Sequence, residues 1–404
     1  AVCRFDPIRR VSATVSAGVD QMKIALLGPI AWRTPPRAYG PWEQVVSLLA
    51  EGLVRRGVDV TLFASLDSVT AAKLDGVVAR PYQEDPELDG RIWEAIHIAN
   101  CLRRSGEFDL VHNNLDWLPL AMSEFCAAPM LTTVHGFCSQ AILPAYQRAR
   151  SAFVSISDAD RGQGIDYLAT VYHGIDVAGF PFSATPGEEL VVFGRIHPDK
   201  GTVDAIEIAR RAGRPLLICG PVHDERYHAE QVLPLVDGTA VRYLGNVGPA
   251  DRADILGRAA ALLHPIGFAE PFGLSVVEAM TCGTPVVAYP KGSMPEVVDH
   301  GVTGFLAGDV PAAVAALPAA LALDRAEVRR RAVARFSADR MVDEYLRVYS
   351  QLIGASAPRS QTRRPTRSAS VRRRANEPRR RPDWKRFPMS LPRRDSLDFS
   401  FSGL

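Results

Sequence analysis

The stretch that most constrains this chain is HPIGFAEPFGLSVVEAMTCGTPVVAY, which runs from His264 to Tyr289. The apolar runs at its two ends, AALLHP and PVVAY, predict two buried strands with a short helix between them. Pro271 and Ser275 mark the start of this helix, and Gly283 suits the left-handed position just past its end. The stretch therefore predicts a strand, helix, strand unit of an α/β fold.

Two carboxylates in this stretch are placed to bind hydroxyl groups. Glu270 lies in the loop before the helix, and Glu278 lies inside the helix, eight residues later. The N-terminus of the helix, near Gly273 and Leu274, offers unsatisfied N–H groups to a phosphate. Because carboxylates accept hydrogen bonds from vicinal hydroxyls, a sugar nucleotide fits both features. The ordinary alternative is a Glu270 that caps the helix and a Glu278 that is exposed.

The run E-P-F-G-L-S-V-V-E-A-M-x-C-G-T-P-V-V-A resembles the donor-site signature of the retaining glycosyltransferases of family 4. The resemblance implies that Glu270 contacts the hydroxyls of the donor sugar and that Glu278 contacts the ribose. It implies that the backbone of Phe272, Gly273 and Leu274 contacts the phosphate and the sugar. It also implies a GT-B fold, in which two doubly wound Rossmann-like α/β domains face each other across a cleft.

A second motif, LVVFGRIHPDKG, is a strand that runs into Gly194 and Arg195, with Lys200 just beyond. Two cations at a strand-to-helix loop suit a diphosphate leaving group, since arginine binds phosphate through two N–H groups and lysine adds a point charge. The motif is similar to the family's G-R-x-x-x-x-K-G, which implies that Arg195 and Lys200 hold the diphosphate. Without that match, two exposed basic residues would be a solvated face.

The base of the nucleotide has an implied place after the next two strands, PLLICGP and VRYLGNV. Family members commonly hold the base there, which implies contacts at Gly220, Pro221 and Val247. His223 and Asp224 are ligands by type, but no second cluster at metal spacing accompanies them. We therefore expect no metal ion and no cofactor, with the nucleotide sugar as a substrate.

The first half of the chain begins with a strand, a glycine loop and a helix, and apolar runs then alternate with helices. This alternation predicts a parallel sheet that is buried on both faces. The loop has no G-x-G-x-x-G, so it does not indicate a nicotinamide site. Gly40 stands where the family has its donor-binding glycines, although Pro41 takes the place of the usual second one. The TVHG segment resembles the family's histidine strand end, which implies that His135 faces the reaction centre. His112 either faces the ligand crevice or is hydrogen-bonded in a loop.

The segment VYHGID resembles the end of the family's first domain, with His173 in place of the usual asparagine. We expect an acceptor domain at residues 22–180 and a nucleotide-sugar domain at residues 181–354. A final amphipathic helix, residues 324–353, has a break near Phe336 and is expected to pack back on the first domain. Residues 1–21 form an extension ahead of Met22, the expected natural start, and we predict that they are disordered.

The charge of the chain is unevenly distributed. Residues 355–404 hold 14 of the 47 basic and 4 of the 45 acidic residues, so residues 1–354 carry a net charge of −8. This Arg-, Ser- and Pro-rich tail is predicted to be disordered. It either contacts an anionic membrane surface, or binds nucleic acid, or is a solvated appendage, and no specific nucleic-acid partner is expected.

The cysteines indicate the compartment. Six cysteines are scattered without a C-x-x-C pair, and no run approaches the ~20 apolar residues that span a bilayer. We therefore expect a reduced cytoplasmic protein, and contact of the tail with the inner face of the membrane is one of the three alternatives given above.

The expected function is transfer of a hexose from a UDP- or GDP-sugar to a small-molecule, glycan or lipid acceptor, without a metal ion. The resemblance implies retention of the anomeric configuration through attack on the same face, with Glu270, Arg195, Lys200 and His135 as the catalytic residues. Sugar-nucleotide epimerases and phosphorylases of related architecture remain alternatives. A nucleotide-sugar binding protein without catalysis and a nucleic-acid protein acting through the tail are the others.

Overall fold

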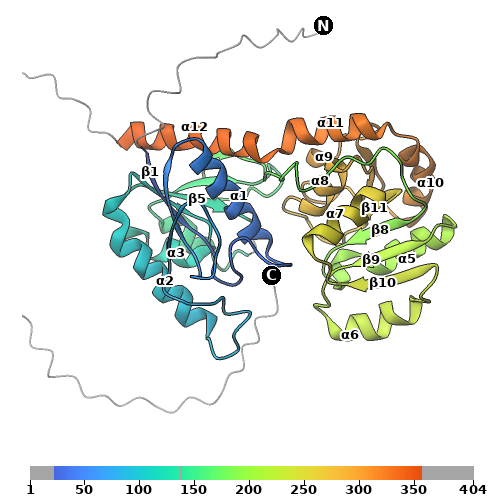
Figure 1. Cartoon of the computed structure of the whole chain (residues 1–404), viewed down its shortest axis with the longest axis horizontal. Coiled ribbons are helices and arrows are strands. Elements are labelled where there is room, and N and C mark those ends of the chain that lie inside the picture. Colours follow the sequence, from blue (N-terminus) through green and yellow to red (C-terminus); the bar gives the residue numbers. More distant parts are fainter. Residues whose placement is uncertain (1–21, 137–138, 357–404) are drawn as a thin grey trace, which may run out of the picture. The chain divides into compact units, whose positions relative to one another are not determined.

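The computed structural model describes residues 22–136 and 139–356 of the 404-residue chain. The predictions for residues 1–21 and for the tail from residue 357 onward therefore lie outside the described residues. Within the described ranges the chain forms two separate parallel sheets with helices between the strands (Figure 1). The prediction of an α/β fold with two doubly wound units is confirmed.

The first sheet contains seven strands in the order β3-β2-β1-β4-β5-β6-β7, all of them parallel to their neighbours. In its interior strand β1 the residues from Ile24 to Leu27 are 0 % exposed, as expected for a strand with helices on both faces. The edge strand β3 had no periodic apolar signal and was not predicted. The strands are β1 Lys23–Leu27, β2 Asp59–Phe63, β3 Lys73–Asp75, β4 Leu110–Asn113, β5 Met130–Val134, β6 Ala152–Ser155 and β7 Tyr167–Thr170.

The helices of this half begin where the sequence supplies a start signal. Pro41 occupies the first position of α1, where a missing N–H costs nothing. Asp89 caps α2 by accepting a hydrogen bond from the backbone N–H of Arg91. The helices are α1 Pro41–Arg55, α2 Gly90–Arg104, α3 Trp117–Ala121 and α4 Leu143–Arg148.

The second sheet contains six parallel strands in the order β10-β9-β8-β11-β12-β13. Gly283, just past the end of α8, has a φ of +89°, as its place in the sequence predicted. The strands are β8 Leu190–Phe193, β9 Leu216–Cys219, β10 Val241–Gly245, β11 Ala261–His264, β12 Val286–Ala288 and β13 Gly304–Leu306. The helices are α5 Thr202–Arg211, α6 Glu225–Tyr227, α7 Pro249–Arg258, α8 Leu274–Thr281, α9 Met294–Val297 and α10 Val310–Leu321.

Two helices end the described chain, α11 Arg325–Phe336 and α12 Ala338–Ser356, and they are separated at Ser337. Helix α11 packs on α8 of the second half, whereas α12 packs on α1 of the first half (Figure 1). Gly52 of α1 permits this approach, because a Cβ there would lie 2.4 Å from a methyl group of Val342. Tyr345 and Tyr349 of α12 are buried in the core of the first sheet. The last helix thus belongs to the first half by packing and follows the second half in sequence.

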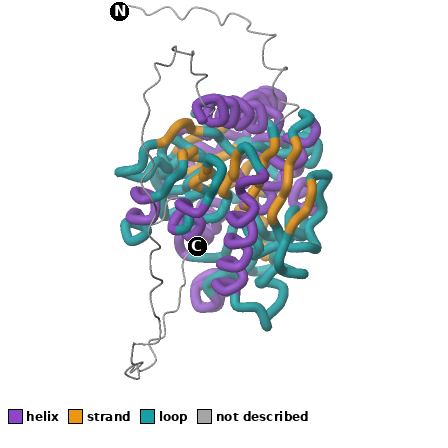
Figure 2. The backbone as a smooth tube through the Cα atoms, turned by 90° about the vertical axis from the view of Figure 1, so that its left-hand side faces the viewer, coloured by secondary structure: helices purple, strands orange, loops and turns teal. Residues whose placement is uncertain are grey.

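The parallel strands of each sheet end at one edge, and this edge is where polar and glycine residues gather. In the first sheet Asn114 and His135 follow strands. In the second sheet Gly194 and Gly220 follow strands, and His264 is the last residue of β11. Figure 2 shows strands enclosed by helices, which leaves the strand ends and loops to contact a ligand. Among the described helices, none combines the length and the apolar character that crossing a membrane requires.

Candidate active site

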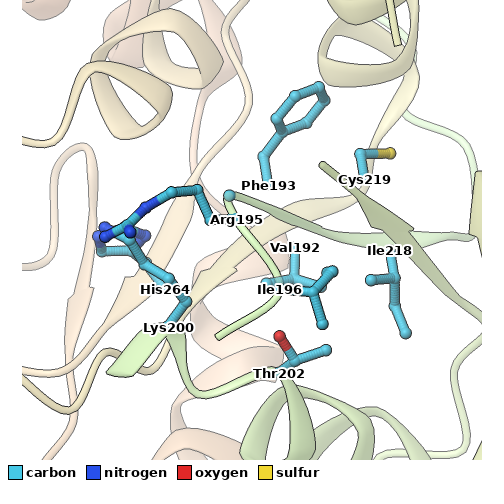
Figure 3. Close-up of a pocket in the computed structure, with 10 residues that line it drawn as sticks. Val192, Phe193, Arg195, Ile196, Lys200, Thr202, Ile218, Cys219 and His264 are labelled. Carbon is cyan, nitrogen blue, oxygen red and sulfur yellow. The ribbon is translucent and has the colours of Figure 1, made fainter. Parts of the chain in front are cut away.

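A small pocket of about 10 Å³ lies at the carboxyl ends of β8, β9 and β11. A pocket of this size has room for roughly one water molecule. Figure 3 shows Arg195, Lys200 and His264 extending their nitrogen-bearing ends toward one side of it. The pocket is lined by Val192, Phe193, Gly194, Arg195, Ile196, Lys200, Thr202, Ile218, Cys219 and His264.

Glu270 lies close to the nitrogen atoms of two side chains that line this pocket. Its Oε2 lies 2.9 Å from Nζ of Lys200 and 3.6 Å from Nε2 of His264. Burial alone would raise the pKa of Glu270, but the nearby His264 ring and the Lys200 ammonium more than offset burial and lower the pKa to about 2. The Glu270 carboxylate is therefore ionised and held beside Lys200 and His264, and it does not cap the helix that follows.

His264 was not among the residues predicted for the site. It ends the apolar strand β11, and its side chain is only 5 % exposed. A polar residue at the end of a buried strand, six positions before a predicted carboxylate, was the signal available in the sequence. Its place beside Lys200 depends on the pairing of β11 with β8, which the sequence alone does not describe.

Arg195 lies at the rim of the same pocket, where glycines bring two loops together. Its Nη2 is 3.6 Å from Oδ2 of Asp199, and its Nη1 is 3.4 Å from Nδ1 of His223. Gly220 has a φ of +143°, and a Cβ there would lie 1.8 Å from the carbonyl oxygen of Gly194. Only glycine permits this approach, so the predicted residues Gly194, Arg195 and Gly220 are neighbours.

Pro221 and Val247 lie near these loops but differ in their surroundings. The Pro221 carbonyl accepts a hydrogen bond from the N–H of Ile196, 2.8 Å away, which places it next to the Arg195 loop. Val247 is partly buried against the core of the second half. The structure thus places Pro221 beside the pocket loops and Val247 against the hydrophobic core.

The start of α8 matches the predicted anion site in geometry. Gly273 precedes the helix with a φ of +89°, and no side chain of the described chain caps the N–H groups of its first turn. Phe272 is 2 % exposed and anchors the loop in the core, while Leu274 begins the helix. The first N–H groups of α8 are consequently available to a phosphate oxygen.

Glu278, inside α8, is buried and forms an ion pair with Arg252 of α7. The alternative of an exposed Glu278 is therefore wrong. Burial raises the pKa of Glu278, and Arg252 partly offsets this rise. Arg252 was not predicted as part of the site, because a single arginine on a helix carries no motif.

His135 follows β5 and stacks between Trp42 and His173, with ring centroids 5.2 and 5.1 Å away. Its Nε2 lies 3.3 Å from Oδ1 of Asn114. Burial lowers the pKa of His135 to about 3, so the ring is neutral at physiological pH. This neutral ring suits hydrogen bonding to a hydroxyl rather than pairing with an anion.

His112 belongs to the core of the first half. Its Nδ1 lies 2.7 Å from the hydroxyl of Tyr349, and its Nε2 lies 2.8 Å from the hydroxyl of Thr133. The side chain is 0 % exposed. Of the two interpretations that the sequence left open, the hydrogen-bonded histidine is the one the structure shows, but His112 lies in the buried strand β4 and not in a loop.

Contacts link the loop between β11 and α8, residues 265–273, to the strand ends of the first sheet. The Ser157 hydroxyl donates a hydrogen bond to the carbonyl of Pro271, at 2.7 Å. The rings of His173 and Phe272 lie 5.1 Å apart in an edge-on arrangement.

Gly40 lies at the start of α1, beside Pro36 and Glu43. In residues 22–136 and 139–356, no three His, Cys, Asp or Glu side chains form a group that could hold a metal ion.

Two parallel sheets, with a cationic pocket at the strand ends of the second and carboxylates in the loop and the helix that follow β11, define an enzyme of the GT-B fold class. A model of the family described as Glycosyltransferase Family 4 matches residues 42–177, and one described as Glycosyl transferases group 1 matches residues 181–335. The chain belongs to the group 1, family 4 glycosyltransferases.

Curated relatives are similar over most of their length. The glycogen synthase of Mycobacterium tuberculosis is 28 % identical over 366 residues, which cover 75 % of this chain and 87 % of the relative. The D-inositol 3-phosphate glycosyltransferase of Mycolicibacterium smegmatis is 27 % identical over 392 residues, which cover 80 % of this chain and 89 % of the relative.

Solved structures share the fold at lower identity. Sucrose-phosphate synthase from Thermosynechococcus elongatus aligns with a TM-score of 0.67 at 19 % identity, covering 83 % of this chain and 100 % of that one. HepE from Anabaena, solved in complex with UDP-glucose, aligns with a TM-score of 0.62 at 20 % identity, covering 82 % of this chain and 100 % of that one. These likenesses show the GT-B fold.

Proposed function

We propose that this glycosyltransferase moves a hexose from a UDP- or GDP-sugar to an acceptor hydroxyl, with retention of the anomeric configuration and without a metal ion. The observation that carries the proposal is the ion pair of Lys200 and Glu270 beside Arg195. One site there offers cations to a diphosphate and a carboxylate to sugar hydroxyls.

The charges of the pocket support a nucleoside diphosphate as the leaving group. Arg195, Lys200 and the N–H groups at the start of α8 are positioned to stabilise the negative charge that grows on the phosphate oxygen. Because these donors are fixed by the fold, they need little reorganisation when the bond breaks. The same donors supply the charge stabilisation that a metal ion would otherwise provide.

In the proposed reaction the bond between the anomeric carbon and the phosphate oxygen breaks, and the acceptor oxygen forms a bond to the same face of that carbon. The leaving phosphate accepts the proton of the acceptor hydroxyl, so the products are the glycoside and the nucleoside diphosphate. Glu270 accepts hydrogen bonds from sugar hydroxyls throughout. His135, neutral because it is buried, orients the sugar through a hydrogen bond.

The names of related proteins support a nucleotide-sugar donor and are compatible with several classes of acceptor. HepE, which shares the fold, was solved with UDP-glucose. The two curated relatives are named for glycogen and for D-inositol 3-phosphate, which differ in size and charge. We propose a glycan, a small polyol or a lipid as the acceptor class for this chain.

For the basic tail we propose peripheral contact with an anionic membrane surface on the cytoplasmic side. Each basic residue near such a surface contributes about 1 kcal/mol. Cosedimentation of the full chain with phosphatidylserine vesicles, compared with a chain that ends after Ala355, tests this. Equal binding by both chains would remove the tail from that role.

The experiment that tests the donor site is a calorimetric titration of the full chain with UDP-, GDP- and ADP-sugars. We expect one nucleotide sugar to bind selectively and to bind at least tenfold more weakly to the Glu278→Ala variant. Release of the nucleoside diphosphate, followed with and without EDTA, and NMR of the product linkage then test metal independence and retention.

Each outcome has a defined meaning. Tight binding of one donor with slow hydrolysis in the absence of acceptor would support transfer and identify the sugar. Binding of no nucleotide sugar in the panel would contradict the proposed donor class. An inverted product linkage would contradict the same-face attack while leaving the donor site intact.

A further inference from the structure

Arg252 reaches from α7 into the donor site and contacts two residues of other elements. It forms an ion pair with Glu278 of α8. Its guanidinium carbon also lies 4.6 Å from the ring centroid of Phe193, in a cation-π arrangement. Phe193 ends β8 and lines the pocket next to Arg195. Arg252 therefore connects the buried carboxylate of α8 to the wall of the diphosphate pocket.

Glu278 depends on this arginine for charge compensation. Its side chain is 10 % exposed, whereas the side chain of Arg252 is 27 % exposed and thus faces the more open side of the pair. A carboxylate buried to this extent is unfavourable in its ionised form unless a cation lies next to it. Arg252 is the cation that lies there.

The ordinary interpretation is a structural ion pair that fastens α7 to α8, and Arg325 shows what such an arginine looks like in this domain. The guanidinium of Arg325 donates to the carbonyls of Ser183, Gly257 and Ala259 at 2.7 to 3.0 Å, and also to the hydroxyl of Thr284. The fold therefore uses four of the five N–H donors of Arg325, including its Nε–H, and no carboxylate lies among these partners.

Arg252 and Glu278 differ from that pattern because each keeps unused polar capacity. Nε of Arg252 is buried and has no hydrogen-bond partner among the described residues. Oε2 of Glu278 faces Nη2 of Arg252 in the ion pair and has no hydrogen-bond partner among the other described residues. Buried polar atoms without hydrogen bonds are rare in native proteins and call for a functional explanation. A ligand hydroxyl is the group that would supply hydrogen bonds to this carboxylate.

We propose that Arg252 is a positioning residue for nucleotide recognition: it holds Glu278 as an oriented carboxylate that accepts hydrogen bonds from the vicinal 2′- and 3′-hydroxyls of the donor ribose. This inference rests on the proposed function, since it assumes a nucleoside diphosphate in the pocket. It assigns the ribose discrimination of the site to the pair of residues rather than to Glu278 alone.

The physical consequence concerns the hydrogen-bonding state of Glu278. Without Arg252 the buried carboxylate takes up a proton, because the neutral acid is the form that burial favours. A carboxylic acid has a donor of its own and is a weaker acceptor than a carboxylate, so the two ribose hydroxyls lose their charge-assisted partner. Removal of Arg252 should therefore weaken the binding of ribonucleotides and leave the binding of dideoxynucleotides almost unchanged.

The test measures the affinity of the full chain for the nucleoside diphosphate of the base selected by the donor panel, and for its 2′,3′-dideoxy counterpart. We expect the wild type to prefer the ribonucleotide by about tenfold or more. In Arg252→Met this preference should fall to about twofold or less, and Arg252→Lys should keep most of it. Arg258→Met is the matched control, because Arg258 lies on the same helix, pairs with Asp254 and is 75 % exposed.

The outcomes separate this inference from the proposed function. An unchanged ribose preference in a folded Arg252→Met variant would overturn the inference, and so would tighter ribonucleotide binding, which would mean that Arg252 competes with the ribose. If Arg252→Met does not fold, Arg252→Gln replaces it in the same comparison. A wild type that binds the diphosphate without any ribose preference overturns the inference alone, whereas a wild type that binds no nucleoside diphosphate overturns both.

Discussion

The two halves of this enzyme build the same doubly wound architecture but differ in the charge of their buried polar groups. In the first half the buried polar groups are largely neutral, and four histidines, His97, His112, His135 and His173, have pKa values lowered by burial. In the second half the site consists of ion pairs, such as Lys200 with Glu270 and Arg252 with Glu278. A shared fold therefore does not dictate the charge of the site that it carries.

The difference follows from the ligand groups that each half is proposed to meet. A nucleoside diphosphate is an anion, so the second half gains by fixing cations in a pocket with little water. Acceptor and sugar hydroxyls are neutral, so the first half can bury uncharged imidazoles that exchange hydrogen bonds with them. The three predictions below test whether this contrast of charged and neutral halves is real, starting from the largest expected effect.

The largest expected effect is acid destabilisation of the first half. A buried neutral histidine stays unprotonated in the folded chain, whereas the unfolded chain takes up a proton below a pKa of ~6.5. Stability is thus fully present above pH 6.5 and is lost as the pH falls. Between pH 6.5 and 5 each of the four histidines should cost about 2 kcal/mol, partly offset by buried carboxyls that gain a proton.

Urea unfolding from pH 7 to pH 5 measures this loss, and hydrogen exchange shows where it occurs. His97→Gln can still donate a hydrogen bond to the carbonyl of Gly28. This variant should take up about one proton fewer than the wild type on unfolding, so its stability should depend less steeply on pH. His300→Gln, at an exposed position of the second half, is the control and should leave the slope unchanged. Constant wild-type stability over this range would contradict the neutral-histidine half of the comparison.

The next effect concerns the charged half. Lys200→Met should lower turnover by about 10²- to 10³-fold, or ~3 to 4 kcal/mol, because a phosphate donor is lost and Glu270 is left without its cation. Initial rates of nucleoside diphosphate release measure the change. Lys73→Met, at an exposed ion pair with Asp59 on the edge of the first sheet, is the control. Near-normal turnover in folded Lys200→Met would show that the charge of this pocket is not catalytic.

Much of the fold and part of the site could be predicted from the sequence, because these features depend on residues that are close together in the chain. The strands, the start of α8 at Gly273 and the cations after β8 follow from apolar runs, glycines and spacing within about 20 residues. The doubly wound class followed for the same reason. Each of these features depends on neighbouring residues, so the sequence alone is sufficient to recognise it.

The remaining part depends on contacts between distant segments. Arg252 reaches Glu278 from another helix, and His264 approaches Lys200 only through the sheet, so neither carries a motif. The short strands β3 and β13 have too few residues for a periodic signal. Burial also decided the role of His112, whose partners Thr133 and Tyr349 come from separate elements.

The smallest of the three effects comes from the exception in the neutral half, Glu43 at the start of α1. Its side chain is buried, its Oε1 accepts a hydrogen bond from the N–H of Trp32, and burial raises its pKa to about 7. A carboxyl with a raised pKa stabilises the fold at low pH, and this contribution is lost as the pH rises from about 4.5 to 7. Glu43→Gln should therefore match the wild type at pH 5 and be more stable at pH 8, by up to about 3 kcal/mol.

Thermal unfolding at both pH values measures the difference, with Glu51→Gln on the same helix as the control. An equal difference at pH 5 and pH 8 would assign the effect to packing, and a loss of stability at pH 8 would show that the first half requires a charge at its strand ends after all.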